Sequence, residues 1–267
     1  MKKIYYNYFI LINLLIILSF FVFLSVLIHN KEFRFNLTRF EKIKKTGVLR
    51  LITNNSINTY YYYNGQPTGF EYDLAKEFAD FLKVDLDIVT PGWSNMFVYL
   101  EQGQGDFIAS GLAITKKRLE KVNFSIPYMD IQQRIIHHKL VYSPKNIEDL
   151  TFRSLHVRRG TSYHSRLEEI KKSGINFNYI LHDNIPTQEL IHMVHNRKIK
   201  LTVAYDNVAY LNQRYYPDIR IGIPLQKKES LAWAVNKEDL EMLEQINKFF
   251  LYANETGILQ NIYDKYY

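Results

Sequence analysis

The spacing of apolar positions changes sharply near the start of the chain. Residues 4–28 contain no charged side chain, are dominated by Ile, Leu and Phe, and follow the pair Lys2-Lys3. A helix of this length covers the roughly 30 Å hydrocarbon core of a bilayer, and preceding cations are typical of the cytoplasmic flank. We therefore expect residues 1–28 to be an uncleaved transmembrane anchor, with a long signal peptide as the alternative.

Beyond this segment the pattern is that of an α/β protein. Residues 29–46 are polar and predict a short helix or a stalk. After them, short apolar runs alternate with stretches of helical spacing, such as Leu74, Phe78 and Leu82. This alternation indicates a largely parallel sheet with helices on both faces. The pattern predicts strands at 48–53, 86–89, 107–110, 134–142, 154–158, 179–181 and 201–205, and helices at 71–82, 93–102, 163–173, 186–197 and within 237–267. A tyrosine-rich loop at 60–63 and a turn at Asn64-Gly65 are expected after the first strand.

The length of the chain fits two lobes of ordinary size better than one core. We expect residues 47–130 and 225–267 to form one lobe and residues 131–224 the other. The chain then crosses twice between the lobes, at the predicted strand 134–142 and on its return through 231–235, which makes a hinge. Because open α/β sheets bind ligands beside the carboxyl ends of their strands, the crevice between the lobes is the expected site.

The segment from Asp106 to Tyr128 carries the clearest binding chemistry. Small and hydroxylated residues follow a predicted strand, and Arg118 stands just after them at the start of a helix. Backbone N–H groups, the Thr115 hydroxyl and the Arg118 guanidinium could converge on one small anion, since arginine binds a carboxylate through two parallel hydrogen bonds. The alternative is a surface arginine on a solvated helix.

Three stretches resemble the bacterial extracellular solute-binding proteins of family 3, which are periplasmic amino-acid receptors of ABC transporters. They are Asn64 to Ala75 with a GF-x-x-DLA pattern, Gly105 to Tyr128 with IT-x-x-R and FS-x-PY, and Arg159 to Ser162 with Val203 to Asp206. The resemblance implies a two-lobed periplasmic-binding-protein type II fold that closes on a small zwitterion, such as an amino acid or a peptide fragment.

The resemblance also implies roles for single residues. It places the ligand carboxylate on Arg118, with Thr115 and Thr161 as donors, and the ligand ammonium on Asp206. The other expected ligand-binding residues are Ser110, Gly111, Ala113, Thr187, Tyr61 and Tyr62, the tyrosines as candidates to stack a ring on the ligand. Ala113, where such receptors often carry a serine, and Lys200, where an acidic residue is usual, depart from the pattern.

Other residues are expected to serve the fold or the surface. Trp93 and Trp233 are predicted to lie in the core. The chain has no cysteine, and its cations are dispersed, without the aromatic platform of a nucleic-acid site. Arg153, Arg158 and Arg159 flank the Gly160-Thr161 loop and could bias the crevice towards anions. We expect neither a metal nor a cofactor.

A second resemblance is to the receptor-like amino-terminal domain of membrane-bound lytic murein transglycosylases. It rests on residues 40–50, 72–82 and 110–112. Residues 257–267 resemble the closing helix of the receptor module, so we expect no murein-cleaving activity. The leading hypothesis is a non-enzymatic receptor tethered to the inner membrane and facing the periplasm. Its partner would be an ABC permease or an envelope murein enzyme.

Two alternatives remain open for the function. The first is an interaction module for a murein enzyme that binds no small ligand. The second is a dehydratase-like enzyme on the same fold, which would need an acid in the crevice such as Asp183 or Glu189.

Overall fold

The computed structural model describes residues 13–25 and 37–267. Residues 13–25 are helical, and they belong to a unit separate from the compact unit formed by Arg39–Tyr267. The expected membrane anchor, residues 1–28, lies partly outside the described residues. So does the expected stalk, residues 29–46, but its residues 39–46 form a helix of the compact unit with Ile43 buried. None of the helices in the described part is long and apolar enough to cross a membrane.

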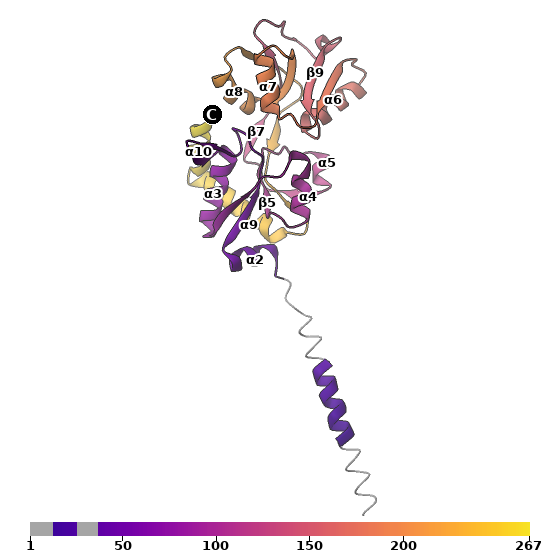
Figure 1. The fold of residues 1–267 in the computed structure, drawn as a ribbon, viewed down its shortest axis with the longest axis vertical. Helices are drawn as coiled ribbons and strands as arrows, with labels where there is room; N and C mark the ends of the chain where they lie inside the picture. Colours follow the sequence, from indigo (N-terminus) through magenta and orange to yellow (C-terminus); the bar gives the residue numbers. More distant parts are fainter. Residues whose placement is uncertain (1–12, 26–36) are drawn as a thin grey trace, which may run out of the picture. The chain divides into compact units, whose positions relative to one another are not determined.

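Residues 39–267 form two lobes, each built on a five-stranded sheet (Figure 1). The sheet of the first lobe has the order β4-β1-β5-β14-β6. Strand β1 runs parallel to β4 and β5, whereas β14 is antiparallel to β5 and β6. The elements of this lobe are α2 (Arg39–Thr46), β1 (Val48–Ile52), β2 (Tyr61–Tyr63), β3 (Gln66–Thr68), α3 (Phe70–Leu82), β4 (Asp85–Val89), η1 (Trp93–Asn95), α4 (Met96–Glu101), β5 (Phe107–Ile108), α5 (Lys116–Leu119), β6 (Val122–Phe124), β14 (Ala234–Asn236), α9 (Leu240–Glu255) and α10 (Ile258–Tyr266).

The second lobe has the sheet order β10-β9-β11-β8-β12. Strands β9, β10 and β11 are parallel, and β8 pairs antiparallel with β11 and β12. Its elements are β8 (Gln133–His138), η2 (Glu148–Leu150), β9 (Ser154–Arg158), α6 (Ser162–Lys172), β10 (Asn178–His182), α7 (Thr187–His195), β11 (Leu201–Tyr205), α8 (Asp206–Tyr215) and β12 (Ile219–Pro224).

Two short antiparallel strands join the lobes. These are β7 (Met129–Ile131) and β13 (Glu229–Leu231), which pair with each other between the lobes. The predicted crossing strand at 134–142 is therefore misplaced, because its observed counterpart β8 lies inside the second sheet. It ends at His138, where the ring Nδ1 accepts the Leu140 N–H at 3.1 Å and the chain turns.

Helix α3 illustrates how the apolar pattern fixes an element. It buries Phe70, Leu74, Phe78 and Leu82, four residues apart, as the spacing predicts. The preceding Gly69 has φ +140°, and a Cβ at this position would lie 2.2 Å from the carbonyl oxygen of Thr59. Only glycine fits there, so the residue sets the angle at which the helix leaves the loop.

The tyrosines expected in a loop form a β-hairpin instead. Strands β2 and β3 pair across the turn at Asn64 and Gly65, which have φ values of 50° and 75°. Two consecutive left-handed residues of this type favour a tight hairpin turn, which overrides the loop expected around Tyr61 and Tyr62. The predicted turn itself is present.

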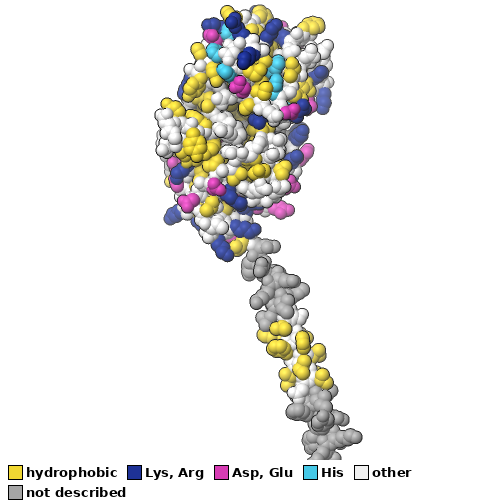
Figure 2. All heavy atoms as spheres, in the orientation of Figure 1, with side chains coloured by type: hydrophobic (Ala, Val, Ile, Leu, Met, Phe, Trp, Pro, Cys, Tyr) yellow, Lys and Arg dark blue, Asp and Glu magenta, His cyan; other side chains and the backbone are white. Residues whose placement is uncertain are grey.

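Lysine and arginine side chains are spread over the visible face of residues 39–267. Figure 2 shows them scattered over both lobes and interspersed with Asp and Glu. They do not gather into one basic patch on this face.

We expect the stability of the protein to depend on pH because of a histidine pair in the second lobe. The His156 Nδ1 and His182 Nε2 atoms lie 2.9 Å apart. Burial is the main cause that lowers the pKa of His156, and the neighbouring His182 lowers it further. Because the folded state binds a proton here less readily than the unfolded chain, stability falls as pH drops below the ordinary histidine pKa of about 6.5. Denaturant unfolding between pH 5 and pH 8 should therefore show a shallower pH slope for His156→Gln than for wild type.

The control is Asn178→Gln, an exposed position on the neighbouring strand β10 that carries no titratable group. This variant should keep the wild-type slope. If His156→Gln keeps the wild-type slope, His156 binds a proton equally well in the folded and unfolded states.

Candidate functional site

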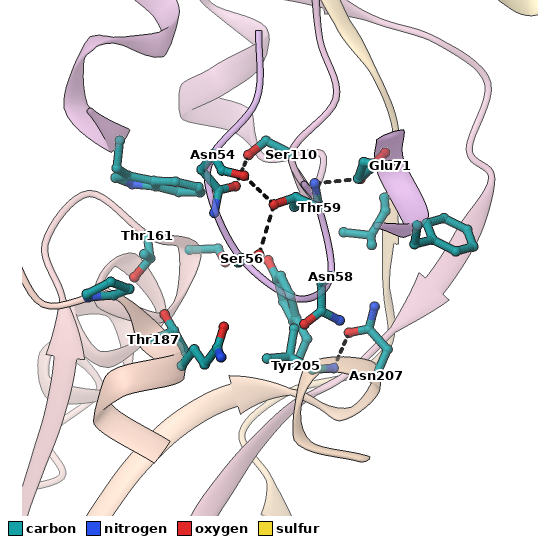
Figure 3. Close-up of a pocket in the computed structure, with 18 of the residues that line it drawn as sticks. Asn54, Ser56, Asn58, Thr59, Glu71, Ser110, Thr161, Thr187, Tyr205 and Asn207 are labelled. Atoms are coloured by element: carbon teal, nitrogen blue, oxygen red, sulfur yellow. Dashed lines mark hydrogen bonds between the residues drawn. The ribbon is translucent and has the colours of Figure 1, made fainter. Parts of the chain in front are cut away.

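A pocket lies between the two lobes, where the carboxyl ends of their parallel strands face each other. The cavity itself measures about 100 Å³, and the space is about 840 Å³ when the solvent at its open mouth is included. From the first lobe it is lined by the loops that follow β1 and β5 and by α5, and from the second by the loop after β9 and the starts of α7 and α8. Figure 3 shows Thr161 and Thr187 across this space from Asn54 and Ser110.

Arg118 reaches the pocket from the short helix α5. Thr115 caps this helix, since its Oγ1 accepts the Arg118 N–H at 3.3 Å. The Arg118 side chain is buried with 9 % exposure, and its Nη1 donates to the Ala113 carbonyl at 2.9 Å. That bond uses one of five N–H donors and orients the guanidinium beside the pocket.

The surroundings of Arg118 combine burial with polar oxygens from both lobes. Burial lowers the pKa of Arg118, and the electrostatic influence of Tyr205, Glu229 and Tyr163 opposes this. Tyr205 and Tyr163 belong to the second lobe, and the Tyr205 hydroxyl is hydrogen-bonded to Ser162. An arginine with a pKa normally above about 12 stays charged in such a site. A fixed cation is thus held at the boundary between the lobes.

Glu71 is a site residue that the sequence analysis missed. This carboxylate from α3 lines the pocket and is 2 % exposed. It accepts hydrogen bonds from Gly111 N at 2.6 Å, Tyr128 Oη at 2.5 Å and Trp233 Nε1 at 2.8 Å. Burial raises the pKa of Glu71, and the three hydrogen bonds act in the opposite direction. The sequence pattern presents this residue only as a helix-start acid inside the GF-x-x-DLA motif.

A polar chain of hydrogen bonds shapes the first-lobe wall. Ser110 Oγ is bonded to Asn54 Oδ1, and Thr59 Oγ1 donates to the Asn54 carbonyl at 2.5 Å (Figure 3). Ser56 Oγ and Thr59 Oγ1 are 2.8 Å apart. Ser110 and Gly111 line the pocket, and Asn54, Ser56 and Thr59 are additional lining residues.

The second-lobe wall contains both predicted threonines. Thr161 caps α6, because its Oγ1 accepts the His164 N–H at 3.3 Å while donating to the Arg158 carbonyl at 2.7 Å. Thr187 is the first residue of α7. Both line the pocket. Helix starts of this kind direct free N–H groups towards a bound anion.

Asp206 lies beside the pocket rather than on its lining. Its Oδ1 accepts the N–H of Gln132 at 3.1 Å and of Asn207 at 3.0 Å, and its own N–H donates to the Gln132 carbonyl at 3.0 Å. These bonds hold the start of α8 against the chain that leaves β7. The neighbouring Tyr205 and Asn207 line the pocket in its place. The role of Asp206 as the ammonium partner stays a prediction.

Four other candidates also lie outside the lining. Ala113 is fully buried and contributes its carbonyl to Arg118, and Thr115 serves as the cap of α5. Tyr61 and Tyr62 stand on the β2–β3 hairpin, where Tyr62 is 66 % exposed. Their contacts with a ligand stay a prediction. The aromatic residues that line the pocket are Phe70, Trp93, Tyr128, Tyr163, Tyr205 and Tyr267.

The two tryptophans separate in the structure. Trp233 is fully buried and packs its ring 4.7 Å from that of Phe250, as expected of a core residue. Trp93 instead lies at the pocket, because the turn of η1 holds it at the edge of the first lobe rather than under a helix. The expectation that Trp93 belongs to the core was wrong.

The acids considered for an enzymatic reaction do not reach the pocket lining. Asp183 pairs with Arg159 at 2.5 Å, and Glu189 lies 3.4 Å from His192, all with exposed side chains. Within residues 13–25 and 37–267 no group of three or more His, Cys, Asp or Glu side chains could hold a metal ion.

Two α/β lobes joined by paired strands, with a pocket between them, form the fold of periplasmic binding proteins. The chain belongs to the bacterial extracellular solute-binding proteins of family 3, whose sequence pattern matches residues 49–267. Among solved structures it is similar to an ancestral amino acid-binding protein described as a precursor of cyclohexadienyl dehydratase. That match has a TM-score of 0.76 and 27 % identity, and covers 86 % of this chain and 99 % of the other.

Another similar structure is an ancestral arginine-binding protein bound to arginine, with a TM-score of 0.75 and 26 % identity over 83 % of this chain and 98 % of the other. Among curated proteins, the chain is 44 % identical over 236 residues to the membrane-bound lytic murein transglycosylase F of Desulfosudis oleivorans. The match covers 88 % of this chain and 52 % of that protein. The chain thus spans about half the length of the curated relatives it matches, consistent with their receptor-like domain.

Proposed function

We propose that this protein is an extracytoplasmic receptor that closes its lobes on a small molecule carrying a carboxylate and an amine, either an amino acid or a short peptide. The observation that carries the proposal is the buried Arg118 at a pocket between two lobes. A carboxylate that enters the pocket meets this guanidinium and the N–H groups at the starts of α6 and α7, which together offset the loss of its hydration.

Closure couples binding to a change of shape. Arg118 belongs to the first lobe, whereas Thr161, Thr187 and Asp206 belong to the second, so a ligand held by both sets favours the conformation in which they are near. We assign the ligand ammonium to Oδ2 of Asp206, since Oδ1 already accepts two backbone N–H groups. This assignment requires a small shift of α8 towards the pocket.

The output that we propose is regulation of an envelope murein enzyme, with delivery to an ABC permease as the second candidate. The similarity to transglycosylase F supports the first. A membrane tether in residues 1–28 and a periplasmic location of the lobes belong to the same proposal. A tethered receptor can regulate a neighbouring enzyme without diffusing, whereas a protein that delivers a solute to a transporter has to diffuse to it.

A thermal-shift screen of the full chain against the common amino acids and short peptides tests the binding proposal. A ligand at a hundredfold excess over its dissociation constant adds about 2.7 kcal/mol to the free energy of unfolding. For a domain of this size we expect Tm to rise by roughly 5–10 °C. If no compound raises Tm, the receptor proposal fails and the non-binding interaction module takes its place.

A further inference from the structure

A second arginine lines the pocket that contains Arg118. Arg158 is the last residue of β9 in the second lobe. Its guanidinium carbon lies 5.4 Å from the ring centre of Trp93, which belongs to the first lobe. This cation–π contact therefore joins the two lobes beside the pocket.

Arg158 has aromatic contact but no acidic partner among residues 13–25 and 37–267. Its Nε is buried and forms no hydrogen bond there, and burial lowers the pKa of Arg158. The next residue differs, because Arg159 forms an exposed ion pair with Asp183. A partly buried guanidinium without an acidic partner is poorly compensated for its lost hydration, and a ligand that brings an anionic oxygen to its N–H groups compensates it.

The charges on the pocket lining are unbalanced. Two guanidinium groups face the pocket, whereas the carboxylate on the described lining, Glu71, is engaged by three donors of the first lobe. A ligand with one carboxylate neutralises Arg118 alone. Binding a ligand with a cationic side chain, such as arginine, would be unfavourable because that side chain would be repelled by Arg158 and would lose its hydration.

We propose that the ligand carries two carboxylates, as an acidic amino acid does either free or within a short peptide. This inference rests on the proposed function. One carboxylate binds Arg118, and the second pairs with Arg158, whose stacking on Trp93 orients its N–H groups. The aliphatic part of the ligand then lies between the two lobes, near the Trp93 ring. The similar arginine-bound protein thus differs from this chain in the charge of the ligand.

Isothermal titration of the full chain with glutamate and glutamine tests this inference, because the two differ by one ionised oxygen at constant shape. We expect wild type to bind glutamate at least about tenfold more tightly than glutamine. Arg158→Gln should lose that preference and bind both alike, with little change for glutamine. Arg159→Gln removes the same charge outside the pocket and should keep the preference. Aspartate, D-glutamate and dipeptides ending in glutamate, measured on wild type, show whether the acid is free or part of a peptide.

The outcomes separate the two proposals. If wild type binds glutamine as tightly as glutamate, or if Arg158→Gln keeps the preference, the dicarboxylate inference is wrong and the receptor proposal stands. If wild type binds neither these compounds nor any other amino acid or peptide, both proposals fail together.

Discussion

Replacing Arg118 with alanine is expected to weaken ligand binding by at least about a hundredfold. A bidentate arginine–carboxylate pair contains two charge-assisted hydrogen bonds of roughly 1.5–3 kcal/mol each, and the loss of about 3 kcal/mol corresponds to a factor near one hundred. Arg118→Lys keeps the charge but loses the planar fork, so we expect a loss of about tenfold or more. The dissociation constants of both variants are measured by titration calorimetry with the compound that gives the largest thermal shift.

The control for this prediction uses the same short helix. Lys116 and Lys117 are exposed cations of α5, so Lys117→Ala removes one charge close to Arg118 without touching the pocket lining. We expect it to bind like wild type. The Tm of Arg118→Ala without ligand shows whether the fold survives the loss of the bond to Ala113. If Arg118→Ala is folded and binds the ligand with wild-type affinity, Arg118 does not contact the ligand.

The sequence predicted the architecture because the elements that build it have strong local patterns. The four-residue spacing of α3, the alternation of polar and apolar residues in β9 and the buried run of β11 identify these elements from the sequence alone. The crossing strands were harder, since β7 and β13 contain three residues each and form only by pairing over a distance of about one hundred positions in the chain. Such pairing leaves no periodic trace in the sequence.

The candidate site was predictable where a motif carries its own chemistry. Arg118, Ser110 and Thr161 follow recognisable patterns, and all three line the pocket. Glu71 and Trp93 were not found, because their surroundings come from other parts of the chain. An acid near a helix start is normally solvated. Only the approach of Gly111, Tyr128 and Trp233 in the folded protein makes Glu71 a buried acceptor.

The partners of Glu71 connect the pocket to the hinge. Gly111 lies in the loop that lines the pocket, Tyr128 directly precedes β7, and Trp233 follows β13 by two residues. A single carboxylate thus fixes the pocket loop relative to the first-lobe ends of both crossing strands. We infer that its hydrogen bonds define the position from which the second lobe moves. Losing them should affect both stability and binding.

Glu71→Gln is therefore expected to lower the free energy of unfolding by about 2–4 kcal/mol. The glutamine has the same shape, but its NH₂ group replaces an acceptor oxygen that faces an N–H or O–H donor. Two buried polar groups then lack partners, at about 1–3 kcal/mol each. For a protein of this size the corresponding fall in Tm is on the order of 5–15 °C, measured by differential scanning calorimetry. Glu71→Leu, which deprives all three donors of their acceptor, should cost more.

Glu77→Gln provides the matched control, since it makes the same change on the same helix at a partly exposed position. Its Tm should stay close to that of wild type. A Tm of Glu71→Gln within about 1 °C of the control would mean that the buried carboxylate is protonated and already behaves as a neutral hydrogen-bonding group. A large fall in Tm with unchanged ligand affinity would instead show that Glu71 stabilises the fold but does not affect binding. The pocket loop would then keep its position without the bond to Gly111.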